Sequence, residues 1–110
     1  MAKRYPTYSR YTRHALALLG KQTKLARKKR GWTEQELADR VGVDRGTVRN
    51  VEAGSPSVAT GTSLEIASLV GVPLFSEEES SLSRALDRTS ELLALLPKKI
   101  QPKRGVDDDF

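Results

Sequence analysis

Apolar residues recur along the chain at the spacings of amphipathic helices, and no segment alternates apolar and polar residues as a half-buried strand does. Glycine, proline and helix-capping residues divide this pattern into five segments. The expected helices span residues 12–30, 34–41, 45–53, 62–70 and 76–96. The pattern therefore predicts an all-α fold with five helices, preceded by an irregular basic arm at 1–11 and followed by a disordered tail at 97–110.

Short sequence signals predict where the helices begin and end. A hydroxyl residue followed three positions later by glutamate, the pattern of a capping box, occurs at 33–36, 62–65 and 76–79. Asp44 is a favourable N-cap for the third helix. Glycines are expected to end the first four helices, at Gly31, Gly42, Gly54 and Gly71.

The first helix is predicted to turn one face toward the core. Leu18, Leu19, Gln22 and Ala26 are expected to mark this face, because they recur at spacings of one, three and four residues. Gly20 is expected to weaken the helix slightly, since glycine in a helix interior has more freedom to lose on folding.

The second and third helices form the most informative part of the pattern. Both are short, and only a tight turn at 42–44 separates them. The small side chain of Ala38 permits two helices to approach closely. Apolar residues are expected to clamp the pair at a fixed angle: Leu37, Val41, Val43, Val48 and Val51. This arrangement predicts a helix-turn-helix, whose second helix enters the major groove of DNA.

The segment 31–54 resembles the helix-turn-helix domain of the Cro/CI-type (XRE) family. The matching pattern is Leu37-Ala38, Gly42-Val43, Thr47-Val48 and Glu52-x-Gly54. With the flanking helices, the resemblance covers about residues 20–75. It implies that residues 12–75 form a DNA-binding domain and that the partner is a double-stranded operator.

The resemblance also implies which residues bind DNA. They are Thr33, Gln35, Asp44, Arg45, Gly46, Thr47, Arg49 and Asn50. Arg45 can donate two hydrogen bonds to a guanine, Asn50 suits adenine, and the methyl group of Thr47 can meet that of a thymine. Gly46 has no side chain with which to recognise a base, but it permits close approach.

Two further features follow from the same resemblance. Arg27 and Glu52 match a structural ion pair that joins the first helix to the recognition helix, so their expected role is orientation. Glu34 departs from the family pattern, in which a glutamine at this position touches a phosphate. A glutamate would repel a phosphate.

The placement of charge agrees with a polyanionic partner. The 110 residues include 19 Lys or Arg and 14 Asp or Glu, which gives a net charge of +5. Ten of the cations and no acid lie within residues 1–33, whereas acids cluster at 77–79 and 107–109. A one-signed block attracts polyanions such as DNA, although a solvated helix face would have the same composition.

Several function classes find no support in the sequence. The chain has no cysteine, and His14 is its single histidine, so we expect neither a disulfide nor a metal site. No Ser/His/Asp set, paired-carboxylate site or glycine-rich phosphate loop is evident, and we expect neither enzyme activity nor a cofactor. No apolar run approaches the roughly 20 residues of a membrane span, and the run at 15–19 is too short for a signal peptide. The expected location is the cytoplasm, at the nucleoid.

The fifth helix is predicted to be amphipathic. Leu82, Leu86, Leu93 and Leu96 recur at spacings of four, seven and three. This face packs either on its own domain or on a second copy of the chain. We favour a homodimer, because two-fold dimers that bind a palindrome compensate for the few contacts of one helix-turn-helix.

A narrower resemblance comes from the loop at 54–62 and from the tail. Both are similar to HipB-type antitoxins, helix-turn-helix regulators that are encoded beside HipA-like kinase toxins. The resemblance implies a homodimer that represses its own operon and binds a HipA-like toxin. The alternative is a phage-type repressor or restriction-system controller without a toxin partner.

The tail has two interpretations. In the first, it orders on the toxin, with its acids at a basic site and its aromatic residue as an apolar anchor. The residues concerned are Asp107, Asp108, Asp109 and Phe110. In the second, the tail is a solubilising terminus without a partner.

Overall fold

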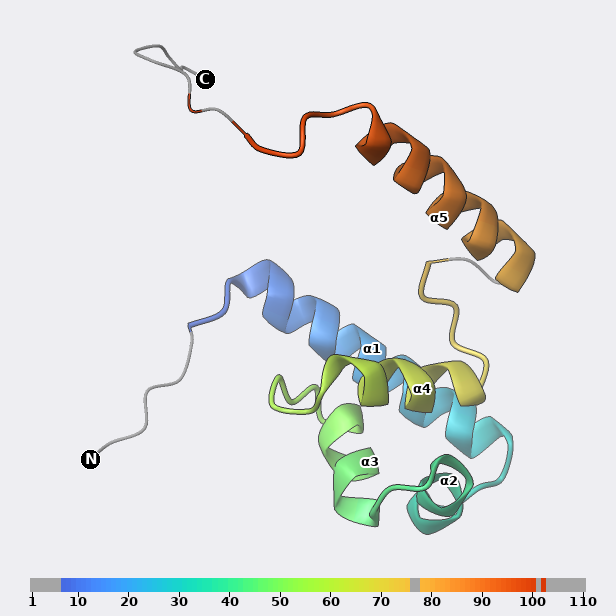
Figure 1. Ribbon diagram of the computed structural model, residues 1–110. Coiled ribbons are helices and arrows are strands. Elements are labelled where there is room, and N and C mark those ends of the chain that lie inside the picture. Colours follow the sequence, from blue (N-terminus) through green and yellow to red (C-terminus); the bar gives the residue numbers. More distant parts are fainter. Residues whose placement is uncertain (1–6, 76–77, 101, 103–110) are drawn as a thin grey trace. The chain divides into compact units, whose positions relative to one another are not determined.

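The computed structural model describes residues 7–75, 78–100 and 102, and every regular element within them is a helix. The helices are α1 (Arg10–Lys29), α2 (Glu34–Val41), α3 (Arg45–Glu52), α4 (Thr60–Leu69) and α5 (Glu79–Ala94) (Figure 1). The predicted all-α fold is therefore confirmed. The chain divides into two units, Met1–Glu77 and Glu78–Phe110, and each is described by itself.

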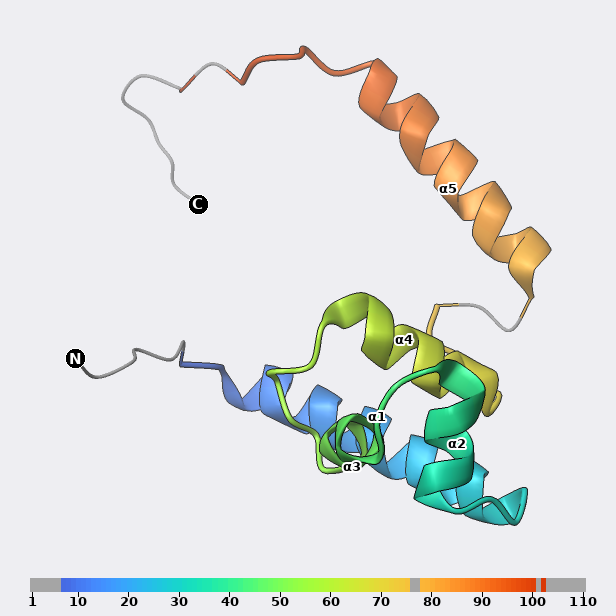
Figure 2. The ribbon, with the colours of Figure 1, turned by 60° about the horizontal axis from the view of Figure 1, so that its bottom comes forward.

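In the first unit, α3 lies at the centre of the packing. It contacts α1, α2 and α4, and α4 also contacts α1 and α2. Figure 1 shows α2 nearly end on and α3 from the side, whereas Figure 2 shows α3 end on. The axes of α2 and α3 are therefore steeply crossed, as the predicted helix-turn-helix requires.

The core of this unit is small and aliphatic. Its buried apolar residues come from α2, α3, α4 and the segment after α4: Leu37, Ala38, Val48, Val51, Ile66, Ala67, Val70 and Val72. Burying a side chain the size of Leu37 or Val48 stabilises the fold by about 1.5–3 kcal/mol. Because the shared core joins these helices, none of them holds its position alone.

Local capping accounts for the ends of α2 and α3. Thr33 Oγ1 accepts a hydrogen bond from Glu36 N–H at 3.0 Å, and Glu36 Oε1 accepts one from Thr33 N–H at 2.8 Å, which confirms the predicted capping box. Asp44 caps α3, since its carboxylate accepts from Thr47 N–H at 2.7 Å. Between them, Gly42 has a φ of 88°, a left-handed conformation that would strain any side chain.

Other helix starts differ from the prediction. α1 begins two residues earlier than expected, because Ser9 Oγ accepts a hydrogen bond from Thr12 N–H at 3.2 Å. The capping box predicted at 62–65 is wrong, since α4 begins at Thr60 and these residues lie inside it. α4 begins after Ala59 without a side-chain cap, so no capping signal marks this start in the sequence.

The buried residues of α1 are Gly20, Thr23 and Arg27, which are spaced three and four residues apart and form one face. Leu19 and Ala26 are partly buried and pack against the core, as predicted. Two of the predicted core positions, Leu18 and Gln22, are exposed, and the prediction is wrong there. A search for apolar periodicity misses this face because none of its three buried residues is a large apolar one.

Gly20 lies where α1 meets the end of α3. A Cβ at this position would come within 2.5 Å of the Val51 carbonyl oxygen and 2.6 Å of the Glu52 carbonyl oxygen. Both are backbone atoms, so they cannot move aside unless α3 shifts. Glycine is therefore required for the contact between the two helices. Gly20, which is expected from the sequence only to weaken α1, is a packing site.

α5 is the helix that the structure describes in the second unit. None of its residues is buried, and the exposed fraction ranges from 44% at Leu82 to 66% at Leu86 along the predicted apolar face. The helix begins at Glu79 and ends at Ala94, so Leu96 lies beyond its end. The predicted capping box at 76–79 begins outside the described residues. No helix in the described part of the chain is long and apolar enough to cross a membrane.

Replacing Gly20 tests the close contact between α1 and α3. The added methyl group of Gly20→Ala collides with the backbone of α3, so we expect the free energy of unfolding to fall by about 1–3 kcal/mol. The measurement is urea unfolding followed by circular dichroism. The matched control is Gly61→Ala in the first turn of α4, where an added Cβ meets nothing within 4 Å. The control should be neutral or slightly stabilising, and equal losses in both variants would contradict the proposed contact.

Candidate nucleic-acid interface

The exposed face of α3 is the surface that the helix-turn-helix presents. Gly46, Arg49 and Asn50 are exposed and follow the i, i+3, i+4 spacing of one helix side, with Arg45 exposed beside them at the helix start. The buried side of the helix consists of Val48, Val51 and Glu52. The structure thus brings four of the residues expected to bind DNA to the solvent side of one helix.

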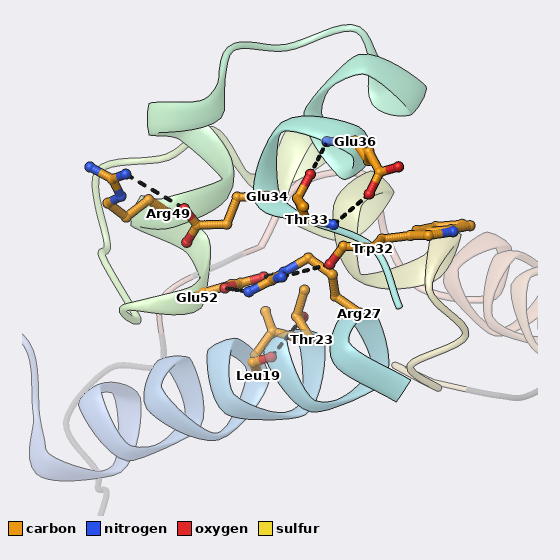
Figure 3. Close-up of polar contacts among 9 residues, drawn as sticks. All are labelled: Leu19, Thr23, Arg27, Trp32, Thr33, Glu34, Glu36, Arg49 and Glu52. Carbon is orange, nitrogen blue, oxygen red and sulfur yellow. Dashed lines mark hydrogen bonds and ion pairs between the residues drawn. The ribbon is translucent and has the colours of Figure 1, made fainter. Parts of the chain in front are cut away.

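The two arginines of α3, Arg45 and Arg49, differ in their polar partners. Within the described residues, no hydrogen bond or ion pair holds the guanidinium group of Arg45. By contrast, Nη2 of Arg49 lies 3.5 Å from Oε1 of Glu34 on α2 (Figure 3). In the sequence, Glu34 stands out only as a departure from the family pattern, and the two residues are too far apart along the chain for spacing to indicate the pair.

Asp44 is exposed, and one of its carboxylate oxygens caps the start of α3. Its Oδ1 accepts hydrogen bonds from Thr47 N–H at 2.7 Å and from the Thr47 hydroxyl group at 2.9 Å. These bonds, the backbone one first, hold the pKa of Asp44 below its usual range. Because the Thr47 hydroxyl donates its hydrogen to Asp44, Thr47 retains its methyl group and the lone pairs of its oxygen for other contacts.

Thr33 and Gln35 belong to the start of α2. The polar groups of Thr33 form the capping box, and Nε2 of Gln35 donates a hydrogen bond to Oδ1 of Asp39 at 2.8 Å. The Glu34–Arg49 pair brings this turn of α2 beside α3. The start of α2 and the exposed face of α3 therefore adjoin each other.

A buried ion pair fixes α3 on α1. Arg27 Nε lies 2.7 Å from Glu52 Oε2, and Arg27 Nη2 lies 3.0 Å from Glu52 Oε1, so the contact is bidentate (Figure 3). Arg27 Nη1 also donates to the carbonyl oxygen of Trp32 at 2.8 Å. The hydrogen bond to Glu52 raises the pKa of Arg27 above its usual value, and this arginine stays charged. One guanidinium group thus ties together α1, α3 and the α1–α2 connection.

A second cluster surrounds Trp32 at the same connection. The guanidinium carbon of Arg40 lies 4.1 Å from the centre of the Trp32 ring, and that of Arg30 lies 5.4 Å from it. Arg30 Nε also donates to the Val70 carbonyl oxygen at 3.3 Å. These contacts could not be predicted from the sequence, because no helical spacing relates the arginines to the tryptophan.

Two expectations from the sequence concern other parts of the chain. The tail residues Asp107, Asp108, Asp109 and Phe110 lie outside the described residues. In the described part, no three or more His, Asp or Glu side chains are grouped so that they could hold a metal ion.

Comparison with known proteins agrees with this geometry. A family model described as helix-turn-helix matches residues 24–75. Neither the curated proteins nor the solved structures include a match to the chain. The matched segment runs from the second half of α1 through α4 and includes the capped turn, the buried ion pair and the exposed face of α3. Residues 24–75 therefore form a helix-turn-helix domain of the Cro/CI-type family of DNA-binding proteins.

Proposed function

We propose that the protein is a sequence-specific DNA-binding regulator of transcription. The observation that carries the proposal is the exposed start of α3, where Arg45 has no partner among the described residues and the helix itself is held rigidly by its cap and by the Arg27–Glu52 pair. In a helix-turn-helix, the first residues of the recognition helix contact base edges in the major groove. Such a protein would act on DNA in the cytoplasm, at the nucleoid.

The side chains on this surface suit direct recognition of bases. Arg45 can donate two hydrogen bonds to a guanine, and Asn50 can bond an adenine. Gly46 supports the same interpretation, because an added Cβ would meet only Oδ1 of Asp44, at 3.3 Å. The fold itself does not require glycine at this position. We infer that the missing side chain lets the helix backbone approach the bases.

Replacing Arg45 tests sequence recognition. In gel-shift titrations against DNA upstream of the protein's own gene, with excess nonspecific competitor, Arg45→Ala should lose roughly 5- to 150-fold in affinity, the value of one bidentate base contact. The control is Lys24→Ala, which removes one exposed charge from α1. Lys24→Ala should retain the discrete shift. If competitor abolishes the shift equally for all three proteins, the regulator proposal has to be withdrawn for this DNA.

We further propose that the protein binds DNA as a homodimer and that α5 supplies the interface. Leu82, Leu86 and Leu93 lie on one side of this helix and are all exposed, which leaves an apolar face in water. A second copy of α5 has the same face and can cover it by two-fold symmetry. A dimer would also place two α3 helices on one operator, which multiplies their few base contacts.

Acidic substitutions on α5 test the dimer. Leu86→Glu combined with Leu93→Glu places two charges on the apolar face, so we expect the mass in solution to fall from that of a dimer to that of a monomer. Light scattering coupled to size-exclusion chromatography measures this mass. The matched control is Ser83→Glu with Ser90→Glu, which adds the same charges at the same spacing on another side of α5. A wild-type protein that is already monomeric at tens of micromolar would rule out the dimer.

The narrower function that we propose is that of an antitoxin, which represses its own operon and binds a HipA-like kinase toxin. The support is the resemblance of the loop at 54–62 and of the tail to HipB-type antitoxins. The regulator function does not depend on this step. A phage-type repressor or restriction-system controller would share the DNA-binding domain but would lack a kinase gene beside its own.

Removing residues 97–110 tests the antitoxin proposal. We expect the truncated protein to lose copurification with the neighbouring kinase, because the acidic and aromatic residues of the tail are the proposed anchor. DNA binding should persist, since the helix-turn-helix is intact, and this serves as the internal control. Equal recovery of the kinase with the full-length and the truncated protein would show that the tail does not bind it.

A further inference from the structure

The pair between Glu34 and Arg49 lies on the surface that the proposed function assigns to DNA. We propose that the Glu34 carboxylate occupies the place of a backbone phosphate and keeps Arg49 out of nonspecific DNA contacts. The inference rests on the proposed DNA binding and adds a specificity-determining residue to it. Glu34 is thus an intramolecular competitor of DNA.

The geometry supports such a competition. Glu34 is the first residue of α2 and Arg49 lies in the second turn of α3, so the pair spans the two helices of the motif (Figure 3). The side chain of Arg49 is 57% exposed, and that of Glu34 is 26% exposed. Arg49 is therefore within reach of a DNA backbone, while Glu34 is held more firmly at a helix N-terminus, where the helix dipole favours negative charge.

An exposed ion pair is weak and can be exchanged. A phosphate that binds Arg49 must displace Glu34, and it then lies beside an uncompensated carboxylate. A loosely docked complex gains its affinity from phosphate contacts, and the pair removes one of them. The contacts of Arg45 with base edges do not require Arg49 to leave Glu34, so they are not weakened by the pair. The pair therefore weakens nonspecific binding more than binding to the correct sequence.

A neighbouring acid provides the control. Glu36 is also in the first turn of α2 and is exposed, but its carboxylate accepts a hydrogen bond from Thr33 N–H and does not contact Arg49. Glutamine at this position retains a capping box. Glu36→Gln therefore removes one negative charge from the same helix turn and leaves the ion pair intact.

The experiment is a double-mutant cycle on a labelled duplex of scrambled sequence, with binding measured by fluorescence anisotropy between 50 and 200 mM salt. Relative to the wild type, Glu34→Gln should bind roughly twofold to fivefold more tightly. Its plot of log affinity against log salt concentration should be steeper by about 0.9, the value for one additional phosphate contact. In the Arg49→Ala background, Glu34→Gln should change neither quantity. Far-ultraviolet circular dichroism checks that each variant is folded.

Two results would overturn the inference. An equal gain from Glu36→Gln would show a general effect of charge at the start of α2. A gain from Glu34→Gln that persists with Arg49→Ala would show direct repulsion of DNA without the ion pair. Neither result affects the proposed function, which is tested separately by Arg45→Ala on the upstream DNA. If neither the wild type nor Glu34→Gln binds the scrambled duplex at any of these salt concentrations, the inference is refuted, whereas the proposed function is decided on the upstream DNA.

Discussion

The buried, bidentate contact between Arg27 and Glu52 is the constraint on which the rest of the domain depends. The contact joins α3 to α1. The same guanidinium group also donates a hydrogen bond to the carbonyl oxygen of Trp32, which lies just before α2. Such a pair adds little net stability, because removing two charges from water offsets their attraction. Its value is geometric, since planar, forked hydrogen bonds allow only a narrow range of positions for α3. A hydrophobic contact of the same size would permit the helix to slide or rotate.

Because the position of α3 is fixed, its small exposed side can serve as the proposed DNA-binding surface. α3 has only eight residues, and its inner side is fully used by the core and the ion pair. The outer side is left with Arg45, which has no partner in the described structure, with Arg49, which is held by Glu34, and with Gly46 and Asn50 beside them. We infer that the two arginines have different tasks. Arg45 would recognise a base, and Arg49 would be withheld from phosphates by Glu34.

The sequence predicted the features that depend on neighbours within a few residues. The capping box at Thr33, the cap at Asp44 and the left-handed Gly42 are of this kind, and together they define the helix-turn-helix. The predictions from the sequence failed at positions whose role depends on contacts with distant parts of the chain. Gly20 looks unfavourable within α1 alone, and its role appears only when α3 is present. The Glu34–Arg49 contact likewise depends on packing between helices, which neither spacing nor composition contains, and the start of α4 has no capping side chain to mark it.

The position of Trp32 has a practical consequence. It is the only tryptophan in the chain, and it lies at the joint between α1 and α2, beneath the guanidinium group of Arg40. The segment from residue 78 onward has neither tryptophan nor tyrosine. Intrinsic emission excited at the indole band therefore reports on this joint alone. The protein has its own optical label, with which opening of the DNA-binding domain can be followed independently of what happens to α5.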